Sequence, residues 1–240
     1  GIASLPVFRR LRVAVLCTGN ELCMPGEALP PGLIYNANRF LLAALLERLG
    51  CVVQDAGEVA DTLPATQAAL RAAAGDNDLV ISSGGVSVGE EDHVRAAVDR
   101  SGRLEMWKIA IKPGKPLAFG HLAANGRDVP FIGLPGNPVS CLVTFLMLVR
   151  PLLLRMQGVG QVTPASYRLL ADFDWPFPDA RREFLRARRH AGDAVELFGN
   201  QGSGVLTSAT WGDGLIDNPP QQVIRRGDAV CFMPFSALLD

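Results

Sequence analysis

Apolar and polar positions along residues 12–157 alternate between two patterns. Short continuous apolar runs are typical of strands buried on both faces, and apolar residues that recur every three or four positions are typical of helices. The predicted strands lie at residues 12–17, 51–56, 78–81, 104–111, 117–119 and 129–134. The predicted helices lie at residues 39–49, 63–74, 93–100 and 139–156. This alternation predicts a mostly parallel sheet with helices on both faces.

Residues with strong local preferences support these boundaries. Asn38 and Thr62 are expected to cap the first two helices, and Gly50 is expected to end the first. Pro151 is expected to kink or end the last helix. The polar residues 121–128 predict a hairpin-like turn.

The pattern changes after Gly158, where short β-like runs alternate with turn residues. The runs lie at residues 167–172, 183–189, 195–198, 223–225 and 229–233. Their spacing predicts a small all-β barrel or sandwich. We therefore expect a linker remnant at 1–11, an α/β domain at 12–157 and a C-terminal β-barrel domain at 158–240.

Charge and cysteine content exclude several classes of protein. The net charge is −1, so no basic excess points to nucleic acid or to an anionic membrane surface. The apolar run at 139–149 is too short to span a bilayer. The five cysteines are odd in number and form no CxxC motif, which predicts reduced, mostly buried thiols in a cytoplasmic protein. The three histidines have no metal-ligand spacing.

The loop that follows the strand at 78–81 contains only small residues. It reads Ser82-Ser83-Gly84-Gly85-Val86-Ser87-Val88-Gly89, and Glu90, Glu91 and Asp92 then open a helix. It is neither a Walker A motif nor a GxGxxG fingerprint. A strand, a glycine loop and a helix N-terminus together predict an anion site, in which the serines donate hydrogen bonds to phosphate rather than act as nucleophiles.

Three further glycine- or proline-rich loops also follow strands. They are Thr18-Gly19-Asn20-Glu21-Leu22, Lys112-Pro113-Gly114-Lys115-Pro116 and Pro135-Gly136-Asn137-Pro138. Because ligands of such sheets bind beyond the carboxyl ends of the strands, we expect all four loops to gather at one edge.

Cations and acids in these loops predict the kind of ligand. Lys108, Lys112 and Lys115 suit phosphate groups, although a solvated turn is the alternative for them. Glu21, Asp61 and Asp92 suit a divalent cation such as Mg²⁺. Together they predict phosphoryl or nucleotidyl chemistry on an anionic substrate.

With these four loops in this order, the chain resembles the molybdopterin molybdenumtransferase family, which includes bacterial MoeA and the E domain of gephyrin and plant Cnx proteins. The resemblance is strong over residues 12–157. It is weaker over 158–240, where it depends on Arg182-Glu183-Phe184-Leu185-Arg186 and on Gln201-Gly202-Ser203-Gly204-Val205-Leu206.

The resemblance implies Mg²⁺-dependent insertion of molybdate into adenylylated molybdopterin (molybdopterin-AMP), with release of AMP. It implies catalytic roles for Glu21, Asp61, Asp92, Lys108 and Lys112, of which the three acids are also the metal ligands. It implies substrate binding by a larger set: Thr18, Gly19, Ser82, Ser83, Gly84, Gly85, Val86, Ser87, Gly89, Pro113, Gly114, Lys115, Pro116, Pro135, Gly136, Asn137 and Pro138. Ser203 either contacts the substrate edge or belongs to a purely structural turn, and the second is expected.

The resemblance also implies partners for this chain, and the chain differs from the family at several positions. Members of the family form homodimers, and a contact with the molybdopterin adenylyltransferase is expected. Asn20 and Asn36 stand where the family usually or often has Asp, which is expected to weaken a metal contact. Family members carry further N-terminal domains, so we expect this chain to be a C-terminal fragment with doubtful activity alone. Two alternatives stay open: an adenylyltransferase-like enzyme, which would lack the barrel, and a non-enzymatic scaffold.

Overall fold

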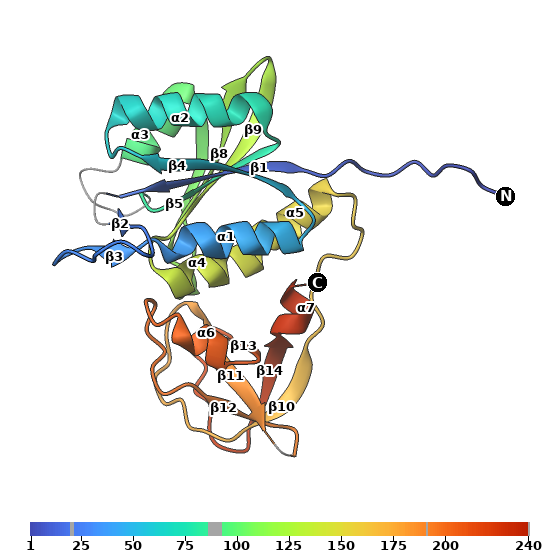
Figure 1. The fold of residues 1–240 in the computed structure, drawn as a ribbon. Helices are drawn as coiled ribbons and strands as arrows, with labels where there is room; N and C mark the ends of the chain where they lie inside the picture. The colour runs from blue at the N-terminus through green and yellow to red at the C-terminus, as the bar shows by residue number, and fades with distance from the viewer. Residues whose placement is uncertain (20–21, 86–92, 191, 240) are drawn as a thin grey trace.

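The computed structural model describes residues 1–19, 22–85, 93–190 and 192–239, and within them the strands form two six-stranded sheets and a two-stranded one (Figure 1). The first sheet contains β1 (Arg12–Thr18), β4 (Val52–Val59), β5 (Leu79–Ser83), β6 (Gly102–Lys108), β8 (Pro116–Ala124) and β9 (Arg127–Leu134). The second contains β7 (Ile111–Lys112), β10 (Tyr167–Ala171), β11 (Arg182–His190), β12 (Ala194–Leu197), β13 (Gly214–Asn218) and β14 (Ala229–Pro234). The short strands β2 (Leu22–Cys23) and β3 (Ile34–Tyr35) pair with each other.

The first sheet confirms the predicted α/β architecture. Its strand order is β4-β1-β5-β9-β8-β6; the first four strands run parallel, and β8 and β6 are antiparallel to their neighbours. Helices α2 (Leu63–Asp76) and α3 (His93–Ser101) cover one face. Helix α1 (Ala37–Arg48) and the helix built from α4 (Pro138–Thr144), η1 (Phe145–Val149) and α5 (Arg150–Met156) cover the other (Figure 1).

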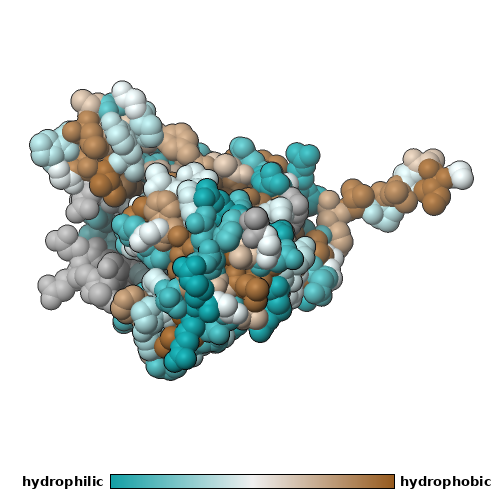
Figure 2. Space-filling view, turned by 90° about the horizontal axis from the view of Figure 1, so that it is seen from below, coloured by the Kyte–Doolittle hydropathy of each residue, from teal (hydrophilic) through white to brown (hydrophobic). Residues whose placement is uncertain are grey.

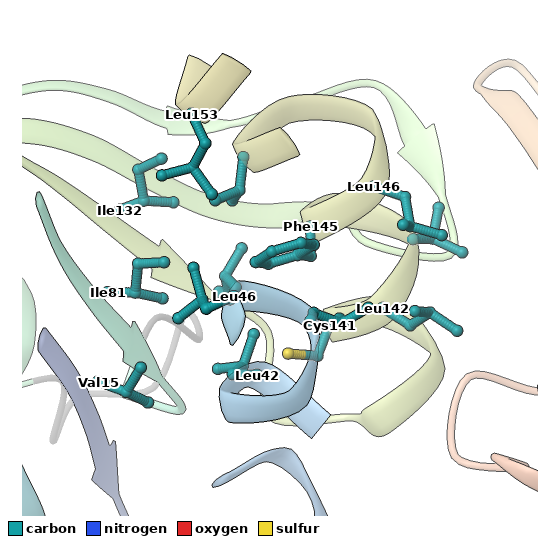
Figure 3. Close-up of a cluster of buried hydrophobic side chains, with 14 of the residues drawn as sticks. Val15, Leu42, Leu46, Ile81, Ile132, Cys141, Leu142, Phe145, Leu146 and Leu153 are labelled. Atoms are coloured by element: carbon teal, nitrogen blue, oxygen red, sulfur yellow. The ribbon is translucent and has the colours of Figure 1, made fainter. Parts of the chain in front are cut away.

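Strand β1 shows why both faces are buried. Val13, Val15 and Cys17 belong to the core under α1 and α4, whereas Ala14 and Leu16 belong to the core under α2 and α3. Successive side chains of a strand point to opposite faces, so a continuous apolar run fills both cores. Figure 3 shows Leu42 and Leu46 of α1 beside Phe145 and Cys141, facing the sheet residues Val15, Ile81 and Ile132 at the left. None of the five cysteines forms a disulfide and four of them are buried, as expected for reduced, mostly buried thiols.

The apolar helix at Pro138–Met156 does not end at Pro151. Phe145–Val149 form a turn of π-helix, in which the Arg150 N–H donates to the Phe145 carbonyl. A widened turn just before Pro151 removes the crowding that its ring would cause in a regular α-helix. Among the described helices, this one of 19 residues is long and apolar enough to cross a membrane by length and composition, contrary to the expectation from residues 139–149. Its burial among both sheets accounts for the same composition.

The second sheet confirms the predicted barrel. Its order is β12-β10-β14-β13-β11-β7, and pairing between β12 and β11 closes the first five strands into a barrel. One local prediction here is wrong, and three elements were missed. Residues 223–225 form no strand, and only Ile224 makes an isolated bridge, with Trp175. Strand β13 and the short helices α6 (Thr207–Trp211) and α7 (Phe235–Leu239) were not predicted.

Two predicted elements of the first domain differ in extent. The expected strand at 104–111 is broken: β6 ends at Lys108, and Ile111–Lys112 pair with β11 of the barrel instead. The expected turn at 121–128 is mostly strand, because β8 and β9 are joined by Asn125 and Gly126 alone, both with positive φ. A two-residue Asn-Gly turn fits the twist of the two strands it connects.

The two sheets share a hydrophobic core. Phe184, Leu215, Met233 and Leu238 of the barrel part pack in the same cluster as α1, α4 and the first sheet. Residues 1–7 instead extend away from the body with exposed apolar side chains (Figure 2), whereas Arg9 pairs with Asp78 of the first domain. The exposed large apolar residues at this end of the chain are Ile2, Leu5, Val7 and Phe8.

Candidate functional site

The ends of β1, β5 and β9 lie side by side, as the sequence predicted. Cys17 is in register with Ser83, and Ser83 is in register with Leu134. The Gly84 N–H continues this ladder by donating to the Leu134 carbonyl at 3.1 Å. The loops after these three strands therefore start from one edge of the sheet.

Asn38 joins two of these loops to helix α1. Its side-chain nitrogen donates to Ser83 Oγ and to the Gly136 carbonyl, both at 2.8 Å. The sequence predicted Asn38 as the helix cap, and this is wrong. Asn36 is the cap, because its Oδ1 accepts the Arg39 N–H at 3.2 Å and α1 begins at Ala37.

The two glycines after β5 are required by close packing. Gly84 and Gly85 have φ values of 87° and 65°, which favour glycine. A Cβ at Gly84 would lie 2.4 Å from the Thr18 carbonyl oxygen, and one at Gly85 would lie 2.5 Å from Val94 Cγ2. The glycines thus allow the loop to pack against the end of β1 and against α3.

A cavity of about 40 Å³ lies at this edge, and we call it the strand-end cavity. Its lining residues are Thr18, Leu22, Ile34, Tyr35, Asn36, Ala37, Asn38, Ser83, Gly84, Gly136 and Pro138. Three polar atoms of these residues are buried without a hydrogen-bond partner in the structure: Thr18 Oγ1, Asn36 Nδ2 and Asn38 Oδ1. An unpartnered buried polar atom costs roughly 1–3 kcal/mol, so these three atoms make this edge of the sheet locally less stable.

A second cavity of about 240 Å³ lies where the Lys112 loop meets the barrel, and we call it the interdomain cavity. Its lining residues are Lys112, Pro113, Trp175, Glu183, Phe184, Leu185, Arg186 and Gln201. The short strand β7 creates it, because Lys112 pairs in register with Glu183 of β11.

Lys112 is held in its charged form by two carboxylates. Its Nζ lies 3.0 Å from Glu183 Oε1 and 3.2 Å from Asp179 Oδ2. Burial by itself would lower the pKa of Lys112, but the bonds to Glu183 and Asp179 outweigh burial and raise it. Glu183 is only 1% exposed, and its Oε2 accepts a hydrogen bond from Trp175 Nε1 at 3.0 Å.

Arg186 is a buried cation whose hydrogen-bond partners are all neutral. Its side chain, 1% exposed, donates to Ser208 Oγ and to the carbonyls of Phe184 and Gly202. Burial lowers the pKa of Arg186 to about 10, so it remains charged at neutral pH. Within the described part of the chain, no carboxylate pairs with it. This uncompensated charge makes the interdomain cavity suited to an anion.

One contact links the two cavities. The Val139 N–H, next to Pro138 of the strand-end cavity, donates to the Ser203 carbonyl at 2.9 Å. Ser203 follows Gly202, whose carbonyl accepts from Arg186 of the interdomain cavity. This hydrogen bond therefore connects the backbone beside the two cavities.

The structure divides the predicted site residues into three groups. Thr18, Ser83, Gly84, Gly136 and Pro138 line the strand-end cavity, and Lys112 and Pro113 line the interdomain cavity. The predicted residues that are described but line neither cavity are Gly19, Asp61, Ser82, Gly85, Lys108, Gly114, Lys115, Pro116, Pro135 and Asn137. Glu21, Val86, Ser87, Gly89 and Asp92 lie outside the described residues, as does Asn20.

The predicted metal site depends mostly on residues outside the described ranges. Asp61, just after β4 and partly buried, is the one predicted ligand with a described position. Among the described residues there is no group of three or more His, Cys, Asp or Glu that could hold a metal ion. The assignment of Glu21, Asp61 and Asp92 to Mg²⁺ stays a prediction.

Sequence reasoning missed the polar residues that the barrel contributes. Glu183, Arg186 and Gln201 line the interdomain cavity, and Gln201 bonds the main chain of Arg186 in both directions. In the structure, Glu183 and Arg186 lie in a strand whose residues 183–187 are all buried. Charged residues inside a buried strand are unusual unless they are paired or functional.

Two family models match separate parts of the chain. Residues 14–155 match a family model described as "Probable molybdopterin binding domain". Residues 168–235 match one described as "MoeA C-terminal region (domain IV)".

Curated relatives and a solved structure show similarity along almost the whole chain. A molybdopterin molybdenumtransferase of Haemophilus influenzae is 40% identical over all of this chain and 60% of its own length. A molybdopterin molybdenumtransferase 2 of Mycobacterium tuberculosis is 36% identical over 93% of this chain and 56% of its own. The crystal structure of a molybdopterin biosynthesis MoeA protein from Pyrococcus horikosii superimposes with a TM-score of 0.78 at 33% identity, covering 95% of this chain and 55% of that one. The chain thus spans little more than half the length of these relatives.

Proposed function

Because the chain belongs to the molybdopterin molybdenumtransferase (MoeA) family, we propose that it provides the substrate-binding part of an enzyme that inserts molybdate into adenylylated molybdopterin and releases AMP. The observation that carries this proposal is the buried, uncompensated Arg186 beside Lys112, in a cavity between the two family-matched parts. Molybdate is an oxyanion, and a guanidinium with neutral partners supplies both charge and hydrogen-bond donors to it.

Lys112 and the two carboxylates that bond to it have separate roles in this proposal. Lys112 contributes a second positive charge, and Glu183 and Asp179 fix its position and keep it protonated. Two cations, Lys112 and Arg186, and one carboxylate, Glu183, line the cavity, while Asp179 is also paired with Arg181. An anion entering it therefore meets a net positive charge.

Magnesium belongs to the proposal through Asp61, with Glu21 and Asp92. Asp61 follows β4 in the first sheet, and a carboxylate there suits a hard divalent cation. When bound, Mg²⁺ would neutralise phosphate charge as AMP leaves. Lys108 and Lys115 are proposed to contact the anionic substrate from the exposed surface around the Lys112 loop.

The alternative activity, molybdopterin adenylyltransferase, is disfavoured. It requires only the α/β fold, whereas this chain adds a closed barrel that matches the MoeA C-terminal region and contributes Arg186 to the interdomain cavity. We further propose a homodimer of the whole protein, a contact with the adenylyltransferase that supplies its substrate, and a cytoplasmic location. The parts of the relatives beyond this chain's match would contribute to the first two.

The proposal is tested by equilibrium binding of molybdate to the chain. Arg186→Gln should weaken binding by roughly tenfold to a hundredfold, because a hydrogen bond to a charged group contributes about 1.5–3 kcal/mol. Arg188→Gln is the matched control on the same strand: Arg188 is exposed, pairs with Glu196 and stacks on Trp211, and it should bind molybdate as the parent chain does. Equal affinities of the two variants would reject the proposal.

A further inference from the structure

A row of three side chains leads from the barrel to the Lys112 loop. Glu183 of β11 is in register with Asn218 of β13 on one side and with Lys112 of β7 on the other. Residues in register on neighbouring strands present their side chains on the same face of the sheet, so the three side chains meet. Glu183 and Asn218 are both buried. The row therefore ties the position of Lys112 to the interior of the barrel.

The two oxygens of the Glu183 carboxylate have different partners. Oε1 faces Lys112 Nζ at 3.0 Å. Oε2 accepts hydrogen bonds from Trp175 Nε1 at 3.0 Å and from Asn218 Nδ2 at 3.3 Å. An indole and an amide are neutral donors, so they hold the carboxylate without competing with the lysine for its charge. With Oε2 held from two directions, the carboxylate is prevented from turning, and Oε1 stays directed at Lys112.

Trp175 and Asn218 are themselves fixed by main-chain groups. The Trp175 N–H donates to the Ile224 carbonyl at 2.8 Å, and the two residues form an isolated bridge. Asn218 Nδ2 also donates to the Gln222 carbonyl at 3.1 Å. Because a carbonyl can only accept, this contact fixes the orientation of the Asn218 amide, and its second N–H is left for Glu183.

We propose that Trp175 and Asn218 are positioning residues for Lys112, acting through Glu183, and this inference rests on the proposed function. Neither residue carries a charge, and Asn218 does not line the interdomain cavity. Their effect on an anion in that cavity passes through the orientation of the Lys112 ammonium. The Lys112 side chain is 40% exposed, and a lysine stem is flexible, so a fixed carboxylate is needed to restrict it.

Asp179, the second carboxylate on Lys112, is a weaker anchor than Glu183. Its side chain is 19% exposed, against 1% for Glu183, and the solvent around it screens the pair more. Its two oxygens also accept hydrogen bonds from the Arg181 guanidinium, at 2.9 and 2.8 Å. The restriction of Lys112 therefore depends mainly on Glu183 and on the two donors that hold it.

The first test measures Lys112 in the full chain and needs no molybdate. A water-soluble acetylating reagent reacts with the neutral amine, and peptide mass spectrometry gives the rate at Lys112 relative to the exposed Lys115 of the same loop. Trp175→Phe keeps an aromatic ring but removes the indole N–H, and it should raise this relative rate about twofold to tenfold, because the ion pair that protects the amine is loosened. Trp211→Phe is the matched control in the barrel part: Trp211 stacks with Arg188 outside the cavity, and the rate should stay as in the parent chain.

The second test is a double-mutant cycle on molybdate affinity, measured by equilibrium dialysis. Trp175→Phe should weaken binding about twofold to tenfold in the parent chain. In the Lys112→Gln background it should have no effect, because no ammonium is left to position. A purely structural role of Trp175 would weaken binding equally in both backgrounds.

A second variant guards against misfolding of the first. Asn218→Ala removes the other donor to Glu183 from a different strand, and it should raise Lys112 acetylation and weaken molybdate binding in the same way. The inference is overturned if neither variant raises the acetylation rate, or if Trp175→Phe weakens molybdate equally with and without Lys112. If the acetylation rates change as expected but the parent chain binds no molybdate, the proposed function fails and the positioning of Lys112 stands.

Discussion

Gly85 is where the backbone of the candidate site is most restricted. Gly85→Ala should lower the free energy of unfolding by about 1–3 kcal/mol, because φ is 65° and the new Cβ would collide with Val94 and with Thr18 Oγ1. Gly126→Ala is the matched control: φ is 72°, but nothing lies within 4 Å of the new Cβ. Urea unfolding of both variants separates the contribution of close packing from that of backbone strain. Equal losses would mean that packing against Thr18 adds nothing.

At the residue scale, the sequence predicted which loops form the candidate site more accurately than it predicted the role of each residue. The run Ser82-Ser83-Gly84-Gly85 predicted a tight turn at a strand end, and the structure confirms it. The reason for the glycines differs from the expected approach of a ligand, since Thr18 and Val94 occupy that space. Arg186 could not be assigned from sequence, because its neutral partners come from residues 184, 202 and 208, which only folding brings together.

Helix α1 gives a prediction at the scale of an element. Asn36→Ala should lower the free energy of unfolding by about 1 kcal/mol, because Asn36 caps α1 through the Arg39 N–H. Asn36→Ser should cost only a few tenths of a kcal/mol, since serine is an equally good cap. Thermal or urea unfolding followed by far-UV circular dichroism measures both. If serine and alanine cost the same, Asn36 does not act as the cap.

The boundaries of elements were predictable only where the local sequence decides them. Thr62 caps α2 as predicted, through the Ala65 N–H, and Pro64 in the first turn favours this start although Asp61 is also a good cap residue. For α1, Asn36 and Asn38 were both suitable, and the choice is settled by Ser83 and Gly136, distant in sequence, which engage Asn38. Strand β13 was missed because Gly212-Asp213-Gly214 and Pro219-Pro220 made its surroundings resemble turns.

Nothing in the local sequence marks the point at which the chain leaves the first sheet and joins the second. Residues 104–111 were predicted as one strand, but β6 ends at Lys108 and Ile111–Lys112 pair with β11 of the barrel. The interdomain cavity depends on this change of sheet, because it sets Lys112 opposite Glu183. The alternation of strands and helices therefore predicted the α/β sheet and the barrel separately, while the cavity between them required the tertiary structure.

For the whole molecule, the shared core predicts that both parts unfold together. Phe184, Leu215, Met233 and Leu238 of the barrel part pack with the α/β core, so neither sheet can lose its packing without exposing apolar surface of the other. Circular dichroism reports mainly the α/β helices. Fluorescence reports mainly the barrel, since Trp175 and Trp211, two of the three tryptophans, lie there. In the parent chain the two signals should give one coincident transition.

Substitutions in the two unshared cores test this coupling from both sides. Ile216 is fully buried in the core of the barrel alone, and Leu70 is buried in the core under α2 and α3. Each change to Ala should cost roughly 2–5 kcal/mol. If the molecule unfolds as one unit, Ile216→Ala lowers the midpoint of helix loss as much as that of fluorescence, and Leu70→Ala lowers the midpoint of fluorescence as much as that of helix loss. A variant that shifts one signal alone would show that the shared cluster does not couple the two sheets, and that the interdomain cavity lies between parts that open independently.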